Sequence, residues 1–542
     1  MHIVLETPGG TGLYLSFNVF GWLIATILIS LGLWQITRKR KVVTSKLQLY
    51  SLLGFLCLCV PMFYGSEFSD HAIPRLLGLA GGLLFLFCLY QFDELTDNPQ
   101  QILWLILIAV ALQASFGLVQ YFILETGDWG GYRPGISKPH GSFLQRNVMA
   151  SFMTTGIALC LYLGRESKYL YFNRLKYCLI YFTLFCSSFL IIPLLSRTGY
   201  LTLISVILLL TPYLFTKNRR QLLKLLFIIL AALISSQVSV IDKPSNLAER
   251  KGTNITARSD IYSITTRLIL DKPIFGSGYG TFERSYLDFN NQLKRQSPEI
   301  NQPLLKLTHP HNEVLYWVSE GGIVAFIGLI LFSIAYMNSW LKINNKLAKR
   351  LAILGLITPL LLHSQLEFPF YTSISHWFVF IILLWFTDIQ SSSDKNKISF
   401  DKTFLLRFFA VLLPVIFLPF LVTTLHTGNI IVEHEKNGYR HIERLLDIEN
   451  PIAWQSRLDK SIFGHTLVAG LREQSPEALQ RYINWGLTRV RHAPRSSVYS
   501  NVLLCLGILK QEKEYQRVLK EAKLTYPLIE EWGINILKAK DD

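Results

Sequence analysis

Charged side chains are scarce in this sequence. Asp, Glu, Lys and Arg make up only 17% of its 542 residues, whereas hydrophobic residues make up 51% and the mean hydropathy is +0.33. A soluble chain of this length carries more charge on its surface. The composition therefore excludes an ordinary soluble globular protein and favours a membrane protein with many spans.

The sequence also lacks a disulfide framework and a single basic surface. The seven cysteines form no disulfide framework, because six lie in apolar runs and only Cys505 falls in a polar region, a distribution typical of small buried thiols. The net charge of +16 is not gathered on one basic face. Lys and Arg cluster between apolar runs, which argues against a nucleic-acid-binding protein.

Apolar runs predict an all-α polytopic fold with about 12 transmembrane helices. Each run has roughly the length that about 30 Å of hydrocarbon demands. The predicted spans lie near residues 14–34, 47–63, 74–92, 101–122, 147–164, 177–196, 198–215, 222–240, 313–337, 350–365, 374–389 and 403–425.

Alternate loops differ in their content of Lys and Arg. The loops 64–73 and 366–373 contain neither residue, whereas the other set of alternate loops is rich in them, at 38–41, 165–176, 217–224, 342–350 and 395–402. Basic loops face the cytoplasm. The segments predicted to lie outside are then 123–146, the turn at Ser196-Arg197, the long loop 241–312, the turn 366–373 and the tail after Leu425.

Residues 426–542 differ in composition from the rest of the chain. They are charged, and their apolar residues recur every three or four positions, as amphipathic helices require. The helical pairs are similar to tetratricopeptide hairpins, although no clear 34-residue period emerges. We predict a membrane domain over 1–425, which includes the loop 241–312, and a small all-α outer domain over 426–542.

Ionisable and amide side chains gather near the outer ends of the predicted spans. Unpaired charge is expensive in hydrocarbon, so such residues are candidates for function. The candidates are Gln145 and Asn147 in "HGSFLQRNVMAS", Arg197 in "LLSRTGY", Arg258 and Arg267 in "ARSDIYSITTRLIL", His309 and His311 in "THPHNEVLYWVSEGG", and Glu367 in "HSQLEFPF".

The stretch from Thr308 to Gly322 predicts where a helix starts and what its first residues can bind. Pro310 disfavours helix at the residue before it, and Asn312 is a good N-cap, so a span should begin at Glu313. His311 then lies beside a helix N-terminus, which attracts anions. Arginines add forked donors for phosphate oxygens, and a neutral imidazole accepts a proton from a hydroxyl.

Plainer explanations apply to each residue taken singly. An Arg at a span end is usually a snorkelling anchor, and an interfacial His is usually structural. His309 and His311 also supply half of a metal site, but no third ligand follows at suitable spacing, and we predict no metal. "GSGYG" at 276–280 lacks the surrounding βαβ pattern of a dinucleotide loop and is interpreted as a turn.

The order of these motifs resembles the bacterial O-antigen ligase and polymerase superfamily. An Arg opens a span, a long outer loop follows with a Pro…Gly-x-Gly turn, and a His-Asn pair precedes a glycine-marked helix, over roughly residues 194–325. "HGSFLQRNVMASF" and "HSQLEFPFYTSISHWF" are similar to segments of the PglL-like branch, the protein O-oligosaccharyltransferases, which also carry a helical tail.

The resemblance implies an inner-membrane glycosyltransferase without cofactors, whose active site faces the periplasm. The donor would be an oligosaccharide on undecaprenyl diphosphate, and the acceptor a Ser or Thr hydroxyl of a periplasmic protein such as a pilin. His311 would be the catalytic His, and Arg197 and Arg258 the diphosphate contacts. Supporting residues would be His309, Asn312, Gln145, Asn147, Arg267, Glu367 and Tyr371, the last in place of the tyrosine that Phe368 replaces.

Two alternatives remain open from the sequence. Another branch of the superfamily would use the same chemistry on a different acceptor, as a ligase acting on lipid A-core or as an O-antigen polymerase. A lipid-glycan transporter without chemistry is a more distant alternative. Transporters place charged or broken helices at mid-membrane, whereas the ionisable residues here lie at outer ends.

Overall fold

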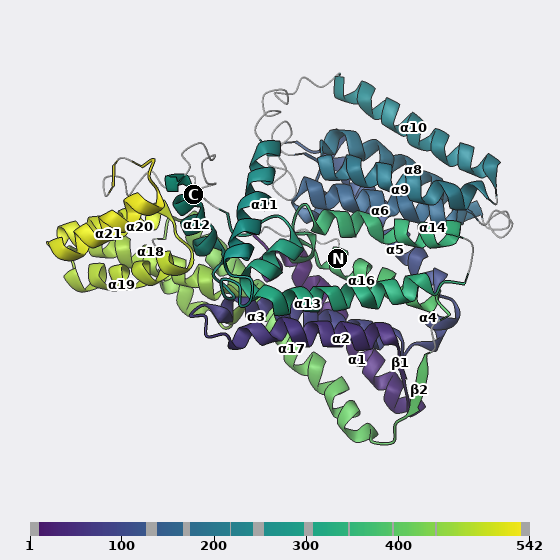
Figure 1. Cartoon of the computed structure of the whole chain (residues 1–542), viewed down its shortest axis with the longest axis horizontal. Coiled ribbons are helices and arrows are strands. Elements are labelled where there is room, and N and C mark those ends of the chain that lie inside the picture. Colours follow the sequence, from purple (N-terminus) through teal and green to yellow (C-terminus); the bar gives the residue numbers. More distant parts are fainter. Residues whose placement is uncertain are drawn as a thin grey trace. The chain divides into compact units, whose positions relative to one another are not determined.

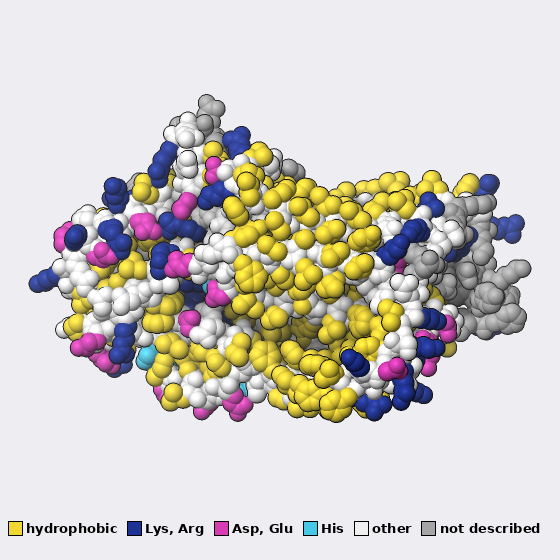
Figure 2. Space-filling model, turned by 60° about the horizontal axis from the view of Figure 1, so that its bottom comes forward, with side chains coloured by type: hydrophobic (Ala, Val, Ile, Leu, Met, Phe, Trp, Pro, Cys, Tyr) yellow, Lys and Arg dark blue, Asp and Glu magenta, His cyan; other side chains and the backbone are white. Residues whose placement is uncertain are grey.

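Helices dominate the computed structural model. It describes residues 10–125, 138–165, 174–216, 218–241, 254–296, 307–344, 347–392, 395–439, 442–529 and 531–532. Within these residues, ten helices are long and apolar enough to cross a membrane, and Figure 2 shows how hydrophobic side chains gather on one face of the molecule. The spanning helices are α1 (Ser16–Lys39), α2 (Lys46–Cys59) continued by η2 (Val60–Phe63), α3 (Ile73–Leu89) preceded by η3 (Ser69–Ala72), α5 (Gln100–Phe122), α8 (Arg174–Leu194), α9 (Arg197–Phe215), α10 (Arg219–Ile241), α13 (Glu313–Leu341), α14 (Leu347–Ser364) and α17 (Thr403–Lys436).

Two further helices complete the predicted set of about twelve. The helix α16 (Ile374–Ile389) is apolar but short. The helix α6 (Arg146–Leu163) packs against α5, α8, α9 and α14 (Figure 1), and every residue from Val148 to Leu163 is buried. Because its neighbours are protein and not lipid, α6 tolerates Ser and Thr, which lower its hydropathy.

The helices fall into two compact units. The first unit contains Met1–Phe55, Gly78–Lys251 and Ile330–Leu425; the second contains Leu56–Leu77, Gly252–Leu329 and His426–Asp542. The boundary predicted at 425/426 falls inside α17, which continues to Lys436 without a linker. That 1–425 and 426–542 form two separate domains stays a prediction.

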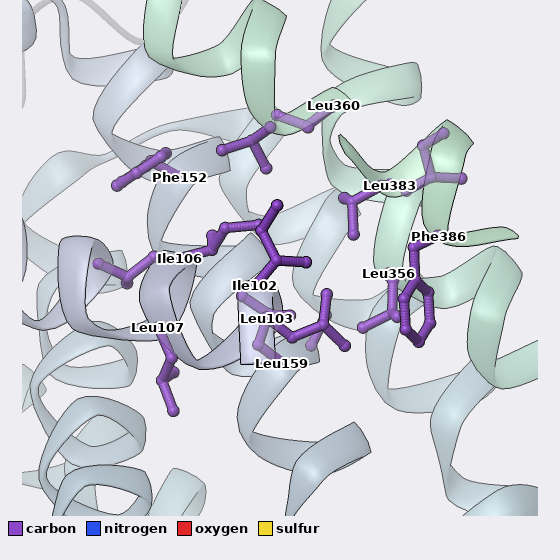
Figure 3. Close-up of a cluster of buried hydrophobic side chains, with 14 of the residues drawn as sticks. Ile102, Leu103, Ile106, Leu107, Phe152, Leu159, Leu356, Leu360, Leu383 and Phe386 are labelled. Atoms are coloured by element: carbon purple, nitrogen blue, oxygen red, sulfur yellow. The ribbon is translucent and has the colours of Figure 1, made fainter. Parts of the chain in front are cut away.

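Close packing of aliphatic side chains holds the first unit together. Leucines and isoleucines of α5, α6, α14 and α16 interlock in the cluster that Figure 3 shows. Small residues let the helix backbones approach: a Cβ at Gly156 of α6 would lie 2.3 Å from Cγ1 of Val110 on α5. In lipid such packing, more than the hydrophobic effect, drives helix association.

A small sheet joins two loops of the first unit. Strand β1 (Lys41–Thr44) pairs antiparallel with β2 (Asn396–Ser399), Lys41 opposite Ser399. Neither strand was predicted from the sequence. Since the pairing needs both loops at the same end of the unit, it agrees with their common basic charge; which side of the membrane they face stays a prediction.

The second unit contains helices in the segment predicted as a long loop. These are α11 (Asn254–Asp271) and α12 (Phe282–Gln296), which pack on each other through Ile261, Ile264, Phe282 and Tyr286. The predicted helical pairs of the tail are confirmed. They are α18 (Gln455–Arg472), α19 (Pro476–His492), α20 (Ser496–Ile508) and α21 (Glu512–Thr525), each packed on the next (Figure 1).

The stack α18–α21, called the helical block below, contacts the segment before α3. The rings of His492 and His71 stack with centroids 3.7 Å apart, and Arg491 pairs with Glu67 at 3.1 Å. Shorter elements complete the described chain: η1 (Gly12–Tyr14), η2 (Val60–Phe63), η3 (Ser69–Ala72), α4 (Asp93–Asp97), η5 (Gly141–Phe143), α15 (Pro369–Thr372), η6 (Ile442–Asp447) and η7 (Ile452–Trp454).

Candidate active site

Three segments of the first unit meet through a chain of polar contacts. Ser196 caps α9: its hydroxyl accepts from the Gly199 amide at 3.1 Å and donates to Oδ1 of Asn147 at 2.9 Å. Nδ2 of Asn147 donates to Oε1 of Glu367 at 3.2 Å. The starts of α6 and α9 and the turn after α14 are thereby tied together, and two predicted site residues, Asn147 and Glu367, touch.

The other predicted site residues of the first unit lie beside this series of hydrogen bonds. Arg197 is the first residue of α9 and Gln145 is the N-cap residue of α6, and both side chains are exposed. Tyr371 lies in α15, where its ring packs on that of Phe368 with centroids 4.7 Å apart. The two exposed side chains are therefore accessible to a solute, whereas Asn147 serves mainly to hold the segments.

The seam between α8 and α9 is as short as the sequence predicted. The helix α8 ends at Leu194, Leu195 takes a left-handed φ of 47°, and Ser196 already caps the next helix. A left-handed residue with a branched side chain costs about 1–2 kcal/mol. The turn keeps Arg197 at the helix end, where free amide groups attract anions.

A second buried network lies one turn further along α6. The Ser151 hydroxyl is 2.7 Å from Nδ1 of His363 and 3.0 Å from Nε2 of His376. Ser373 lies 2.9 Å from the other nitrogen of His376 and also caps α16. Both imidazoles are fully buried. Neither histidine was among the predicted site residues, although a His inside an apolar run is itself a signal.

The motif with the two histidines lies in the second unit. Asn312 caps α13 as predicted, its Oδ1 accepting from the Leu315 amide at 2.9 Å, and the helix begins at Glu313. His311 has a left-handed φ of 55°, and its carbonyl accepts from the Tyr262 hydroxyl at 3.0 Å. Such backbone strain is often found at functional sites.

The two imidazole rings contact each other. The ring of His309 meets that of His311 edge to face, with centroids 4.5 Å apart, and Nδ1 of His309 lies 2.8 Å from the Thr308 hydroxyl. Among the described residues, no group of three or more His, Cys, Asp or Glu side chains is placed to hold a metal ion.

The two candidate arginines of α11 face in different directions. Arg258 and Arg267 are nine positions apart, about two and a half turns, so they project from opposite sides of the helix. Arg258 shares its side with Tyr262, one turn on, which binds the His311 carbonyl; Arg267 is exposed. Arg258 therefore lies on the side of α11 that contacts the His311 segment, and the roles of both arginines stay predictions.

The "GSGYG" stretch is a turn, as predicted, and it is locked onto α13. The amides of Ser277 and Gly278 donate to the carbonyls of Ser319 and Glu320 at 2.8 and 3.0 Å. Gly322 breaks α13 with a φ of 61°, and a Cβ there would lie 2.2 Å from the Ile274 carbonyl oxygen. Glycine is needed because two backbones touch.

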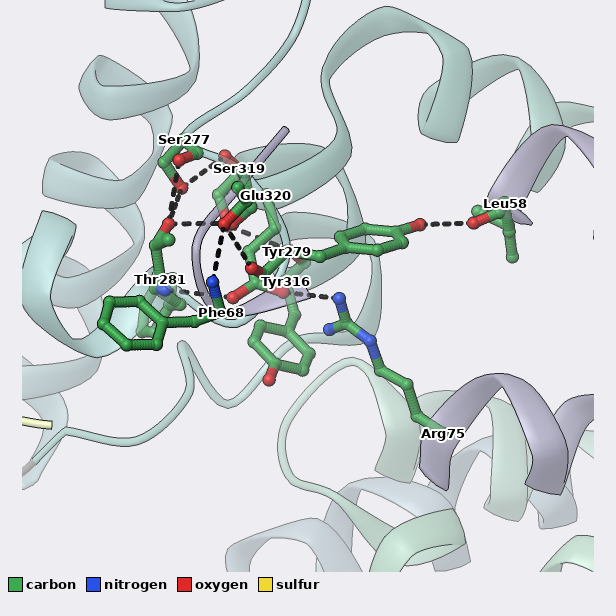
Figure 4. Close-up of polar contacts among 12 residues, drawn as sticks. Leu58, Phe68, Arg75, Ser277, Tyr279, Thr281, Tyr316, Ser319 and Glu320 are labelled. Atoms are coloured by element: carbon green, nitrogen blue, oxygen red, sulfur yellow. Dashed lines mark hydrogen bonds and ion pairs between the residues drawn. The ribbon is translucent and has the colours of Figure 1, made fainter. Parts of the chain in front are cut away.

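A buried ion pair lies beside the contact between the 276–280 turn and α13 (Figure 4). Arg75 of α3 pairs with Glu320, whose carboxylate also accepts from the Phe282 amide at 2.9 Å. The Arg75 guanidinium lies 4.3–4.6 Å from the ring centres of three aromatic residues, Trp317, Tyr279 and Tyr316. Burial raises the pKa of Tyr279, whose hydroxyl donates to the Leu58 carbonyl at 2.7 Å.

These observations define a polytopic helical membrane protein with capped helix starts, exposed arginines and a constrained histidine near span ends. Two family models match the chain. The model described as "O-Antigen ligase" matches residues 182–330, which include Arg197, Arg258 and His311. The model described as "Virulence factor membrane-bound polymerase, C-terminal" matches residues 351–532, from α14 through the helical block.

The chain therefore belongs to the superfamily of O-antigen ligases and membrane-bound polymerases. Members of this family are membrane enzymes that transfer glycans, which agrees with the multi-pass character of the structure. No curated protein matches the chain.

Proposed function

We propose that the protein is a protein O-oligosaccharyltransferase of the bacterial inner membrane. It would transfer a glycan from undecaprenyl diphosphate to a Ser or Thr hydroxyl of a periplasmic protein such as a pilin. The alternative acceptors are lipid A-core, for a ligase, and a second lipid-linked glycan, for a polymerase. A protein acceptor needs a surface that can present a polypeptide near the reacting groups.

The observation that supports a protein acceptor is the attachment of the helical block to α12, which packs on the helix that holds the His311 carbonyl. Arg284 of α12 donates to the Tyr499 hydroxyl at 3.0 Å and to Oε1 of Glu521 at 2.9 Å. Arg495 pairs with Glu283, and Leu287 joins the core of the block. The other side of α12 packs on α11.

Through these contacts α12 bridges two parts of the second unit. On one side lies α11 with Tyr262, which holds the His311 carbonyl; on the other lie α19 and α21. A polypeptide bound to the block would be coupled to the histidine segment by packed side chains. A transferase that joins two lipid-linked glycans has no evident need for this bridge.

The proposed mechanism assigns one step to each group. Arg197 and Arg258 bind the diphosphate and stabilise the charge that develops as the bond between the sugar anomeric carbon and the phosphate oxygen breaks. A neutral His311 takes the proton of the acceptor hydroxyl as its oxygen bonds to the anomeric carbon. Undecaprenyl diphosphate leaves with the electron pair and needs no strong acid.

The acceptor class is tested with the purified full chain in proteoliposomes that contain a glycan on undecaprenyl diphosphate. Pilin-type protein, lipid A-core or no further acceptor is added, and products are resolved by mass. We expect glycan on the protein. Transfer to lipid A-core alone, or lengthening of the lipid-linked glycan alone, would contradict the proposal.

The bridge is tested by Arg284→Met, which removes the contacts to Tyr499 and Glu521. We expect lower transfer to protein with the donor affinity unchanged. The matched control is Arg517→Met, since Arg517 is exposed and pairs with Glu514 within its own helix. Equal losses in both variants would remove the bridge from the argument.

The polymerase is the second candidate function. It is favoured by the description of the model that matches residues 351–532. A polymerase would lengthen the lipid-linked glycan when no other acceptor is present, so the third reaction of the same assay distinguishes the two functions.

A further inference from the structure

The connection between α11 and α12 exposes large apolar side chains. Leu270 is 72% exposed, Ile274 59% and Phe275 62%; nearby Phe63 is 86% exposed. The ring of Phe275 packs edge-on against Tyr64 with centroids 5.1 Å apart. We call residues 270–275 the hydrophobic tip. Exposed apolar clusters of this kind mark surfaces that a partner or a membrane covers.

The exposed residues of α13 indicate where the hydrocarbon begins relative to this tip. Of its large hydrophobic residues before the break at Gly322, Val314 alone is exposed. After the break, exposed apolar side chains recur every three or four positions: Ile323, Phe326, Ile327, Ile330, Ile334, Met337 and Leu341. This regular stripe is the lipid-facing side of a span.

The length of the stripe fits a bilayer. Of the 29 residues of α13, ten precede Ile323 and 19 remain. At 1.5 Å per residue these 19 cover about 28 Å, close to the roughly 30 Å of hydrocarbon in a bilayer. The hydrocarbon therefore begins at about Ile323.

The tip is bonded to α13 at that same level. The Ile323 amide donates to the Ile274 carbonyl at 3.2 Å, and Gly276 packs against Glu320. Asp271 and Lys272, beside the apolar residues, are exposed. We propose that the hydrophobic tip, with Phe63, inserts into the bilayer interface, its partner being the upper acyl chains of phospholipids and its charged residues meeting the headgroups.

Insertion of the tip would also fix the position of the catalytic groups. This second point rests on the proposed function, whereas the lipid contact is independent of it. The tip continues α11, which carries Arg258 and Tyr262, and Tyr262 holds the His311 carbonyl. A tip anchored in the interface fixes these groups relative to the membrane surface. A lipid-linked diphosphate is presented at that surface.

The test places a photoreactive residue at single positions of the full chain. Benzoylphenylalanine replaces Phe275 in one variant and Leu270 in a second, in case the first does not fold. The variants are reconstituted in nanodiscs of phosphatidylethanolamine and phosphatidylglycerol without glycan donor. Ile327, on the lipid-facing stripe, is the positive control, and Val314, exposed before the break, is the negative control.

After illumination, mass spectrometry measures the fraction of each labelled peptide that carries a phospholipid. We expect a yield at 275 or 270 comparable to that at 327 and about tenfold above that at 314. A yield no higher than at 314 would overturn the proposal, as would crosslinks to a second copy of the chain in place of lipid. Since no donor is present, the result is independent of catalytic activity.

Discussion

Removal of the Arg75 charge should be far more damaging than removal of the Glu320 charge, although the two form one ion pair. Both side chains are almost completely buried, Arg75 with 5% and Glu320 with 1% of the side chain exposed. Breaking a buried pair by deleting one partner costs about 3–5 kcal/mol, because an uncompensated charge stays behind. The surroundings of the remaining charge decide how large that cost is.

The charge that stays buried has different surroundings in the two single variants. In Glu320→Gln the guanidinium keeps its three aromatic rings, and each such contact is worth about 0.5–2 kcal/mol; the amide oxygen still accepts from Phe282. In Arg75→Met the carboxylate is left buried without its ion-pair partner. We expect a loss of about 3–5 kcal/mol for Arg75→Met, a smaller loss for Glu320→Gln, and partial recovery in the double variant.

The assay is thermal unfolding of the purified protein in nanodiscs. At about 1 °C per kcal/mol for a chain of 542 residues that unfolds cooperatively, Arg75→Met should lower the Tm by roughly 3–5 °C. The control is Arg491→Met: its pair with Glu67 is exposed, with side-chain exposures of 54% and 55%, and such pairs contribute about 1 kcal/mol or less. Equal losses for the two single variants, with strictly additive loss in the double, would refute the reasoning.

Three further predictions concern catalysis and pH. His311→Ala should lower transfer by about 10² to 10⁴ at normal membrane abundance, with His309→Ala milder; the reverse order would move the base to His309, and loss of wild-type activity on adding chelator would bring back a metal. Arg197→Lys should already impair transfer because it loses the forked donors, and Arg197→Ala more so; normal activity in Arg197→Ala would remove it from the mechanism. Burial, and next the imidazole of His71, lower the pKa of His492 to about 3; the unfolded state then binds more protons below about pH 6.5, so stability should fall by about 1 kcal/mol per pH unit between pH 6 and 4, and His492→Phe should flatten that slope in thermal unfolding.

Features written in short stretches of sequence were predictable. The cap at Asn312, the start of α13 and the seam at Ser196 depend on neighbours within a few residues, and each follows from backbone chemistry. The apolar runs predicted the spans for the same reason. The observed helix ends differ most from the predicted ones where a helix continues beyond its apolar run, as α17 does. Hydropathy marks the residues that lie in hydrocarbon, and it does not mark where the helical hydrogen bonds end.

Features that join distant parts of the chain were not predictable from one sequence. Ser151 and His363 are 212 positions apart, and Arg75 and Glu320 are 245 apart. A lone polar residue in an apolar run indicates that a partner exists, but nothing local identifies it. The strand pairing of β1 with β2 escaped for the same reason.

The break in α13 divides the helix into two parts with different surroundings. His311 lies just before the first part, which Asn312 caps, and the second part begins with Ile323 and carries the exposed apolar stripe. The predicted base therefore belongs to the end of α13 that precedes the lipid-facing stripe. The proposed mechanism needs the acceptor hydroxyl, the anomeric carbon and the diphosphate to meet beside His311. A lipid-linked donor can extend its diphosphate and glycan from the bilayer toward that end of the helix, where a soluble acceptor also arrives.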